Sequence, residues 1–351
     1  MSESVAAANP HDHALVIGIR RYADVAAGWV KDLKGPDHDA AAVAAWLRSP
    51  AGGGLPHDNV RVICSADFPD PFEGGHGEPA EVRISKAFKE IARLPKAHGQ
   101  FAGRRLYVYV SGHGFATRRD QAGILAADSV KVTPLIVDVT SFTNWLYEAA
   151  TFQELVLWAD ACAERVPPTH LVGFPERPQG SPNAPSVRLF ESFAAPIGLR
   201  AVENQMPDGQ WHGAFTYALL RGLEGAAQTP VTSITLRNYL RNALKGFIGE
   251  ADRGRKTVAK EPAFGRTDEV QLAAPAASTF SVTIHFPPEA VGKLATVARG
   301  RTVPPADQTT LADTQWRPSL EAGLYVVLVS DLGLAETFEV GGGLEAEVIV
   351  S

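Results

Sequence analysis

The feature that most constrains the fold is an alternation of short apolar runs with amphipathic stretches in the first half of the chain. The apolar runs are residues 14–19, 60–64, 106–110 and 155–159, and the amphipathic segments between them are 36–47, 82–94 and 142–150. Strands that are apolar throughout, rather than at every second position, are buried on both faces. The pattern therefore predicts an α/β fold, with a mostly parallel sheet between two layers of helices.

The remaining sequence predicts further elements of this unit and a change of character near residue 274. We expect a strand at 192–197, helices at 214–223 and 236–247, a loop at 249–260 and a short strand at 270–272. Beyond residue 274, strand-like runs at 281–286, 324–330, 336–340 and 345–350 are separated by Pro and Gly turns. The predicted division is a flexible N-terminus at 1–12, an α/β domain at 13–273 with a Pro-rich loop at 166–186, and a small all-β domain, sandwich-like, at 274–351.

Composition and charge exclude several classes of function. The 351-residue chain has a net charge of −6, which argues against nucleic acid as a direct partner because phosphate binding needs a basic face. No apolar run is long enough for a membrane helix, and the N-terminus shows no signal-peptide pattern. Two cysteines do not make a disulfide framework, so we expect a cytoplasmic protein.

Two reactive side chains follow two of the predicted strands. His113 comes just after one apolar run and Cys162 just after another, and parallel strands present their carboxyl ends at one edge of a sheet. Either residue alone has an ordinary structural role, a cysteine as a small packing residue. Together they predict a cysteine nucleophile and its base, with the N–H groups of Gly114 and Cys162 as oxyanion donors. Cys64 has no acid–base neighbour in sequence and is interpreted as a packing residue. The histidines lack metal-ligand spacing, so we expect neither a metal nor a cofactor.

With these residues the chain resembles the caspase-like cysteine peptidases, in particular the bacterial and metacaspase-type members. The similar segments are Ala-Leu-Val-Ile-Gly-Ile at 14–19, Leu-Lys-Gly-Pro-Asp-His-Asp-Ala at 33–40, Ser-Gly-His-Gly at 111–114, Asp-Ala-Cys at 160–162 and His-Gly-Ala-Phe-Thr-Tyr-Ala-Leu-Leu-Arg-Gly-Leu at 212–223. The resemblance implies a caspase-like α/β/α sandwich at 13–273, a His113–Cys162 dyad and an acyl-enzyme intermediate.

The resemblance also bears on specificity. It implies that Asp39, Ser111 and Asp160 line the pocket for the substrate residue before the cleaved bond, the P1 residue. Two carboxylates there favour a cationic side chain, so we expect cleavage after Arg and, second, after Lys. Calcium-binding acidic clusters are not recognisable near 118–128, so the sequence does not predict calcium dependence. The family's biology suggests a regulated protease in bacterial defence or cell death.

Two alternatives stay open at this stage. Arg20 and Arg21, just after the first strand, could serve an Asp-selective caspase-like pocket. A scaffold that kept the fold without activity is the other alternative, although an intact His113 and Cys162 argue against it. The expected partner is a protein substrate, with a regulatory protein or activating ligand at the C-terminal domain. For self-cleavage, the Arg188–Leu189 bond is favoured over the one after Arg177, because Pro178 follows Arg177.

Overall fold

The computed structural model describes most of the chain. It covers residues 9–23, 28–68, 77–96, 101–165, 171–174, 178, 180–227, 230–273, 279–299, 305–321, 323–340 and 346–350. Residues 1–8 of the predicted N-terminal tail, and 166–170, 175–177 and 179 of the predicted Pro-rich loop, lie outside the described residues, so the proposed cleavage after Arg177 does as well.

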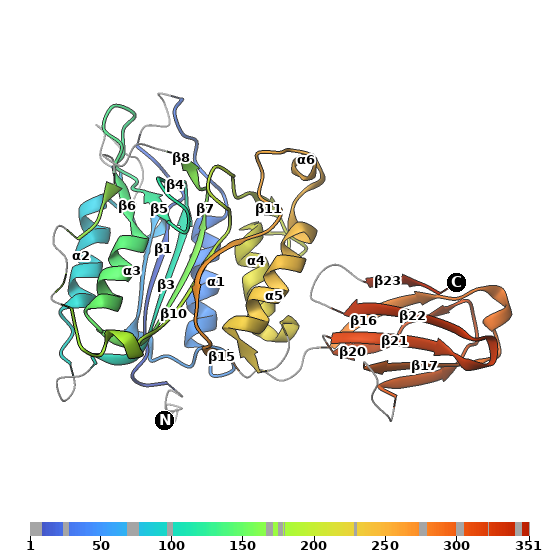
Figure 1. Ribbon diagram of the computed structural model, residues 1–351. Coiled ribbons are helices and arrows are strands. Elements are labelled where there is room, and N and C mark those ends of the chain that lie inside the picture. Colours follow the sequence, from blue (N-terminus) through green and yellow to red (C-terminus); the bar gives the residue numbers. More distant parts are fainter. Residues whose placement is uncertain are drawn as a thin grey trace, which may run out of the picture.

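A six-stranded sheet forms the centre of the first 273 residues (Figure 1). Its strand order is β14-β10-β7-β3-β1-β2, and all neighbours are parallel except β14, which is antiparallel to β10. The strands are β1 (His13–Gly18), β2 (Val60–Cys64), β3 (Gly103–Gly112), β7 (Phe152–Ala161), β10 (Arg188–Phe193) and β14 (Ala263–Thr267). The predicted mostly parallel sheet is confirmed.

Helices cover both faces of this sheet, as the continuous apolar strands predict. Figure 1 shows α2 and α3 on one side and α4 and α5 on the other. Successive residues of β7 alternate between two hydrophobic clusters, so Leu157 packs with α2 and α3 while Trp158 packs with α1, α4 and α5. The helices are α1 (Pro36–Arg48), α2 (Glu81–Ala92), α3 (Val139–Glu148), α4 (Ala214–Arg221), α5 (Ser233–Ala243) and the short α6 (Glu250–Arg253), which lies in the segment predicted as a loop.

Strand β10 begins four residues before its predicted position, because charged residues are accommodated at its start. Arg188 forms an ion pair with Glu154 of β7, and the buried Glu191 accepts the backbone N–H of Arg266. The Arg188–Leu189 bond therefore lies within a central strand between β7 and β14. Because a peptidase binds its substrate as an accessible extended segment, self-cleavage at this bond is not compatible with the folded sheet.

Smaller strands that the sequence did not predict surround the carboxyl edge of the central sheet. A five-stranded sheet of order β8-β4-β5-β6-β9 extends from the ends of β3 and β7, and a hairpin of β11 and β12 precedes α4. These strands are β4 (Gly114–Ala116), β5 (Gly123–Leu125), β6 (Ile136–Asp138), β8 (Glu164–Arg165), β9 (Leu171–Val172), β11 (Glu203–Gln205) and β12 (Trp211–Gly213). Elsewhere, β13 (Val231–Thr232) pairs with β15 (Gln271–Ala273), which corresponds to the short strand predicted at 270–272.

The described residues after 279 form strands and 3-10 turns but no α-helix. Two four-stranded sheets contribute to a single hydrophobic cluster that includes Val282, Ile284, Val297 and Val327. The strands are β16 (Thr279–His285), β17 (Leu294–Arg299), β18 (Asp307–Thr310), β19 (Gln315–Trp316), β20 (Ser319–Glu321), β21 (Gly323–Val329), β22 (Leu334–Val340) and β23 (Ala346–Ile349). The four predicted strands are present as β16, β21, β22 and β23, whereas β17, β18, β19 and β20 were not predicted. No helix in the described part of the chain is long and apolar enough to cross a membrane.

Candidate active site

The predicted site residues meet at the carboxyl ends of two adjacent strands. β3 and β7 pair in parallel with Ser111 opposite Asp160, so the chain leaves both strands at the same edge of the sheet. A cavity of about 590 Å³ opens there, large enough for several side chains of a bound peptide. The predicted residues that line it are Asp39, Ser111, His113, Asp160 and Cys162.

Hydrogen bonds hold His113 in one orientation and one tautomer. Its Nε2 lies 2.8 Å from the carbonyl oxygen of Lys31, which can only accept, so Nε2 carries the proton. Its backbone N–H donates to the Tyr22 hydroxyl at 2.8 Å, and the two rings lie 4.8 Å apart. Burial lowers the pKa of His113, although the Lys31 carbonyl opposes this shift. The imidazole is therefore neutral near pH 7, and Nδ1 is the nitrogen that can accept a proton.

Cys162 is a thiol rather than a thiolate in the resting molecule. The half-buried side chain follows β7, and its Sγ–H donates to the carbonyl oxygen of Ala201 at 3.6 Å. Burial raises the pKa of Cys162 to about 11. With a neutral His113, the site does not store a thiolate–imidazolium pair, so the thiol proton has to leave as the sulfur attacks a carbonyl.

Gly114 is required by the close approach of two backbone segments. A Cβ at this position would lie 2.4 Å from the Cys162 carbonyl oxygen and 2.5 Å from the Ala161 Cβ. No side chain fits in that space, so the glycine lets β4 pass directly beside the peptide of Cys162. This arrangement places the Gly114 and Cys162 backbones, the predicted oxyanion donors, next to each other.

Asp160 is fully enclosed and is held from one side by Thr216 of α4. Its Oδ2 accepts the Thr216 hydroxyl at 2.6 Å and the Thr216 N–H at 2.9 Å. Burial, and after it the nearby charge of Asp39, raises the pKa of Asp160 to about 7. The Tyr109 hydroxyl in turn donates to Thr216 at 2.7 Å, because the Thr216 proton is used on Asp160.

Asp39, on α1, is the second buried carboxyl of the cavity. Its Oδ1 lies 2.7 Å from Nδ1 of His212, and its Oδ2 accepts the Gly213 N–H at 3.0 Å. The Ser111 hydroxyl donates to Oδ2 at a longer 3.5 Å. Burial raises the pKa of Asp39 and the ion pair with His212 opposes that shift, while Asp39 raises the pKa of His212. His212 and the Gly213 N–H therefore favour the charged form of Asp39, against the effect of burial.

Glu203, His212 and Thr216 were not predicted as site residues, although they complete this pocket. Glu203, at the start of β11, also lines the cavity, and its Oε2 accepts the N–H groups of Lys34 and Gly35 at 2.8 Å each. His212 and Thr216 lie within the 212–223 segment that resembles a family helix, so a signal for them was present. Glu203 had none, because it lies in a polar stretch without a motif.

The arginines considered for an acidic substrate residue are directed elsewhere. Arg20 forms an ion pair with Asp37 at 2.9 Å, and the buried Arg21 donates to the carbonyl oxygens of Ser65 and Phe68. Neither residue lines the cavity. The two arginines that do, Arg200 and Arg255, are paired with carboxylates. The alternative of an Asp-selective pocket built on Arg20 and Arg21 is therefore wrong.

Cys64 lies apart from this site, at the end of β2. It is buried in the hydrophobic cluster beneath α1, and burial raises its pKa to about 11. It does not line the cavity. Among the residues with a described position, no group of three or more His, Cys, Asp or Glu side chains is placed to hold a metal ion.

Two comparisons with known proteins match this chain. The family model of the caspase domain matches residues 11–261. A probable protease from a Desulfuromonadales bacterium is 32% identical over 238 residues, which are 65% of this chain and 27% of that protein. The chain thus spans only about a quarter of this relative's length.

Proposed function

The chain belongs to the caspase-domain family, and we propose that it is a cysteine endopeptidase that cleaves proteins after Arg and, less efficiently, after Lys. The observation that carries the proposed specificity is the acidic lining of the cavity beside Cys162. Asp39, Asp160 and Glu203 all line it, and its two arginines are already paired. A guanidinium can form paired hydrogen bonds with such carboxylates, whereas an acidic P1 side chain would meet like charge.

The proposed reaction uses Cys162 as nucleophile and His113 as the proton carrier. Sγ attacks the carbonyl carbon of the P1 residue while the thiol proton moves to Nδ1 of His113. The N–H groups of Gly114 and Cys162 stabilise the oxyanion. His113 then protonates the leaving amine as the C–N bond breaks, which leaves a thioester. Water attacks the thioester, gives its proton to His113 and releases the carboxylate, and the thiol is restored.

The resting hydrogen bonds support a role for substrate binding in starting this sequence. The Cys162 thiol is bonded to the Ala201 carbonyl, and its raised pKa keeps it protonated. A P1 cation beside Asp160 favours the ionised form of its carboxyl. The pocket therefore takes up the negative charge that complements the substrate when the substrate binds. We therefore propose that an unoccupied site has little reactivity toward general alkylating reagents.

The finer biological assignments are proposals that rest on the family resemblance. We propose that residues 274–351 form a separate β-domain that binds a regulator or the substrate protein. We also propose a cytoplasmic protease under tight control, in bacterial defence or cell death. Both Cys64 and Cys162 are free, which fits a reducing compartment.

Fluorogenic peptides that differ only at P1 test the proposed function. With Arg, Lys or Asp at P1, we expect turnover in the order Arg, then Lys, and none above background for Asp. Cys162→Ala should abolish all turnover, and Asp160→Ala should remove the Arg preference. Asp138→Asn is the matched control, since Asp138 is a buried aspartate outside the cavity. Faster cleavage after Asp would refute the acidic-pocket argument, and no turnover of any peptide by correctly folded protein would favour a scaffold.

A further inference from the structure

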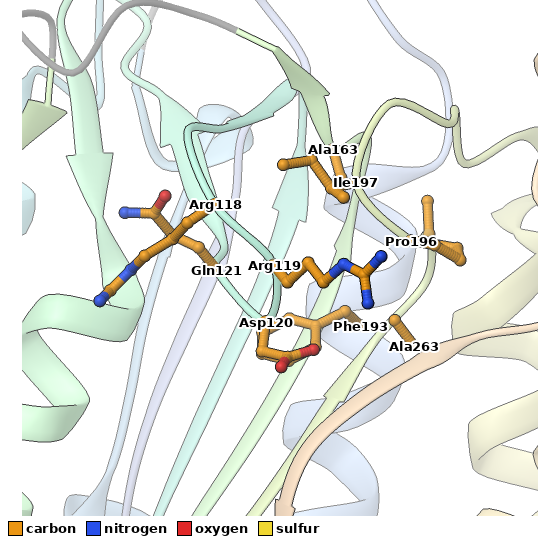
Figure 2. A pocket seen from close by; sticks show the side chains of 10 residues that line it. Arg118, Arg119, Asp120, Gln121, Ala163, Phe193, Pro196, Ile197 and Ala263 are labelled. Carbon is orange, nitrogen blue, oxygen red and sulfur yellow. The ribbon is translucent and has the colours of Figure 1, made fainter.

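A second cavity, of about 320 Å³, lies beside the chain that follows Cys162 (Figure 2). Its walls come from the turn at 117–121 between β4 and β5, from residues 195–197 after β10, and from Ala163, Phe193 and Ala263. None of these residues lines the cavity that contains Cys162. The volume falls within the range of small-ligand sites in proteins.

Two arginines, of which one is directed toward the apolar residues, and a mostly apolar remaining wall define the chemistry of this second cavity. Figure 2 shows the Arg119 guanidinium directed between Phe193, Pro196 and Ala263, while the Arg118 side chain points away from them. Within the described residues, Arg119 has no ion-pair partner. Arg119 is an exposed residue, so an anion would be held by paired hydrogen bonds to its guanidinium together with apolar contacts to the cavity wall.

The charges around Arg119 favour an anion with a single charge. Asp120 lines the same cavity as Arg118 and Arg119, so the lining carries one net positive charge. The buried Glu191, two residues before Phe193 in β10, adds acidic character within electrostatic range of Asp120 and Arg118. A dianion such as a phosphate monoester would meet more repulsion than a carboxylate here.

Backbone hydrogen bonds connect the second cavity to the reactive thiol. The Ala163 N–H donates to the Leu199 carbonyl at 3.0 Å, and the Gly198 N–H donates to the Ala163 carbonyl at 2.7 Å. The same segment continues to Ala201, whose carbonyl accepts the Cys162 thiol. A ligand that contacts residues 195–197 therefore contacts the same 195–201 segment whose Ala201 carbonyl accepts the Cys162 thiol.

We propose that the second cavity is an effector site for a small monocarboxylate with an apolar body, and that its occupation changes the reactivity of Cys162 through the 195–201 segment. The ligand's carboxylate pairs with Arg119 and its apolar body packs against Phe193, Pro196 and Ala263. The binding part of this proposal stands independently of the proposed peptidase activity, whereas the effect on Cys162 rests on it.

Binding is tested first, with the inert Cys162→Ala chain and 3-phenylpropanoate as the probe. We expect saturable binding, with a Kd of about a millimolar or tighter by titration calorimetry or ligand-observed NMR at pH 8. The neutral 3-phenylpropanamide and the dianionic phenyl phosphate should each bind at least about tenfold more weakly.

Variants distinguish a specific contact between the probe's carboxylate and Arg119 from a general electrostatic attraction of the probe to the 117–121 turn. Arg119→Gln should weaken binding of 3-phenylpropanoate by about tenfold or more, and Arg118→Gln by less than about threefold. Ala263→Leu, which adds apolar volume to the cavity wall and leaves the charge of Arg119 unchanged, should also weaken binding at least about tenfold. Equal binding of the acid and its amide, or an unchanged Kd in both Arg119→Gln and Ala263→Leu, would overturn the site.

The effect on Cys162 is then measured with the active chain and an Arg peptide. Saturating 3-phenylpropanoate should change kcat/KM by at least about threefold, and Arg119→Gln should remove this response while it retains the basal activity. Binding without any change in kcat/KM would overturn the effector role. A chain that binds the probe but cleaves no peptide would refute the peptidase proposal and leave the binding site intact.

Discussion

Replacing Thr216 by Val offers a sharp test of how the acidic pocket recognises its substrate. The Thr216 hydroxyl is one of two donors to Oδ2 of Asp160, and Val has nearly the same shape without the hydroxyl. Loss of a hydrogen bond to an ionised group costs about 1.5–3 kcal/mol. Since about 1.36 kcal/mol corresponds to one pKa unit, the pKa of Asp160 should rise by about one to two units.

The assay is the pH dependence of kcat/KM for an Arg peptide. In the wild type, a buried Asp160 with a pKa of about 7 is neutral at low pH, so kcat/KM should fall as the pH decreases through about 7. The pKa of His113 is lowered and that of Cys162 is near 11, so neither group produces this fall in kcat/KM near pH 7, which we call the acid limb. Because Asp160 interacts with Asp39, the limb belongs to the pair of carboxyls.

In Thr216→Val the acid limb should move upward by about one to two pH units, which at pH 7 means a loss of about five- to fiftyfold in kcat/KM. Near pH 9.5 most of the activity should return. Thr216→Ser keeps the hydroxyl and should keep the limb in place. A citrulline peptide, isosteric with Arg but uncharged, should lack the limb. The reasoning is refuted if the limb stays near pH 7 in a folded Thr216→Val protein, or if Thr216→Ser moves it equally.

Three further substitutions probe the same site. Asp160→Asn should abolish Arg-directed cleavage. It should also stabilise the fold at pH 8 by on the order of a few kcal/mol, because the pKa of Asp160 is higher in the folded than in the unfolded chain and the cost of ionising it grows as the pH rises to about 7. Thermal unfolding at pH 5 should show a smaller gain in stability, and equal gains at both pH values would contradict this. Gly114→Ala should lower kcat by about a hundredfold or more, since its Cβ would meet the Cys162 carbonyl, whereas Gly254→Ala, with open space at that position, should not; equal kinetics in both would argue against the oxyanion role. Glu203→Gln keeps an acceptor for the backbone N–H groups but removes a charge, so KM for Arg peptides should rise about tenfold with kcat unchanged. An unchanged KM would show that the charge of Glu203 does not contribute to binding the P1 side chain.

The reactive residues could be placed from sequence because each directly follows an apolar strand. The parallel pairing of β3 and β7 then puts His113 and Cys162 at one edge of the sheet without further information. The neighbours that set their proton affinities could not be placed in this way. Lys31 and Ala201 contact the dyad through backbone carbonyls, which carry no sequence signature.

The pocket beside the dyad shows a similar limit. Asp39 and Asp160 were expected from the resemblance, but the contacts of His212 and Thr216 join segments far apart in the sequence. Strand β10 was misplaced because charged residues usually indicate surface, whereas the strand includes the buried Glu191, which accepts the Arg266 N–H, and begins at the exposed Arg188, which pairs with Glu154. The small strands at 114–138 are too short for a periodic signal to separate them from loop.

Covalent trapping tests the central claim most directly, namely that Cys162 is the nucleophile of an Arg-directed dyad. A peptidyl-Arg chloromethyl ketone should add once to the wild-type chain, and peptide mapping should place the adduct on Cys162 and not on Cys64. His113→Ala should slow the labelling by about a hundredfold or more, and the corresponding Asp reagent should react far more slowly than the Arg reagent. An adduct on Cys64, or faster labelling by the Asp reagent, would contradict the account.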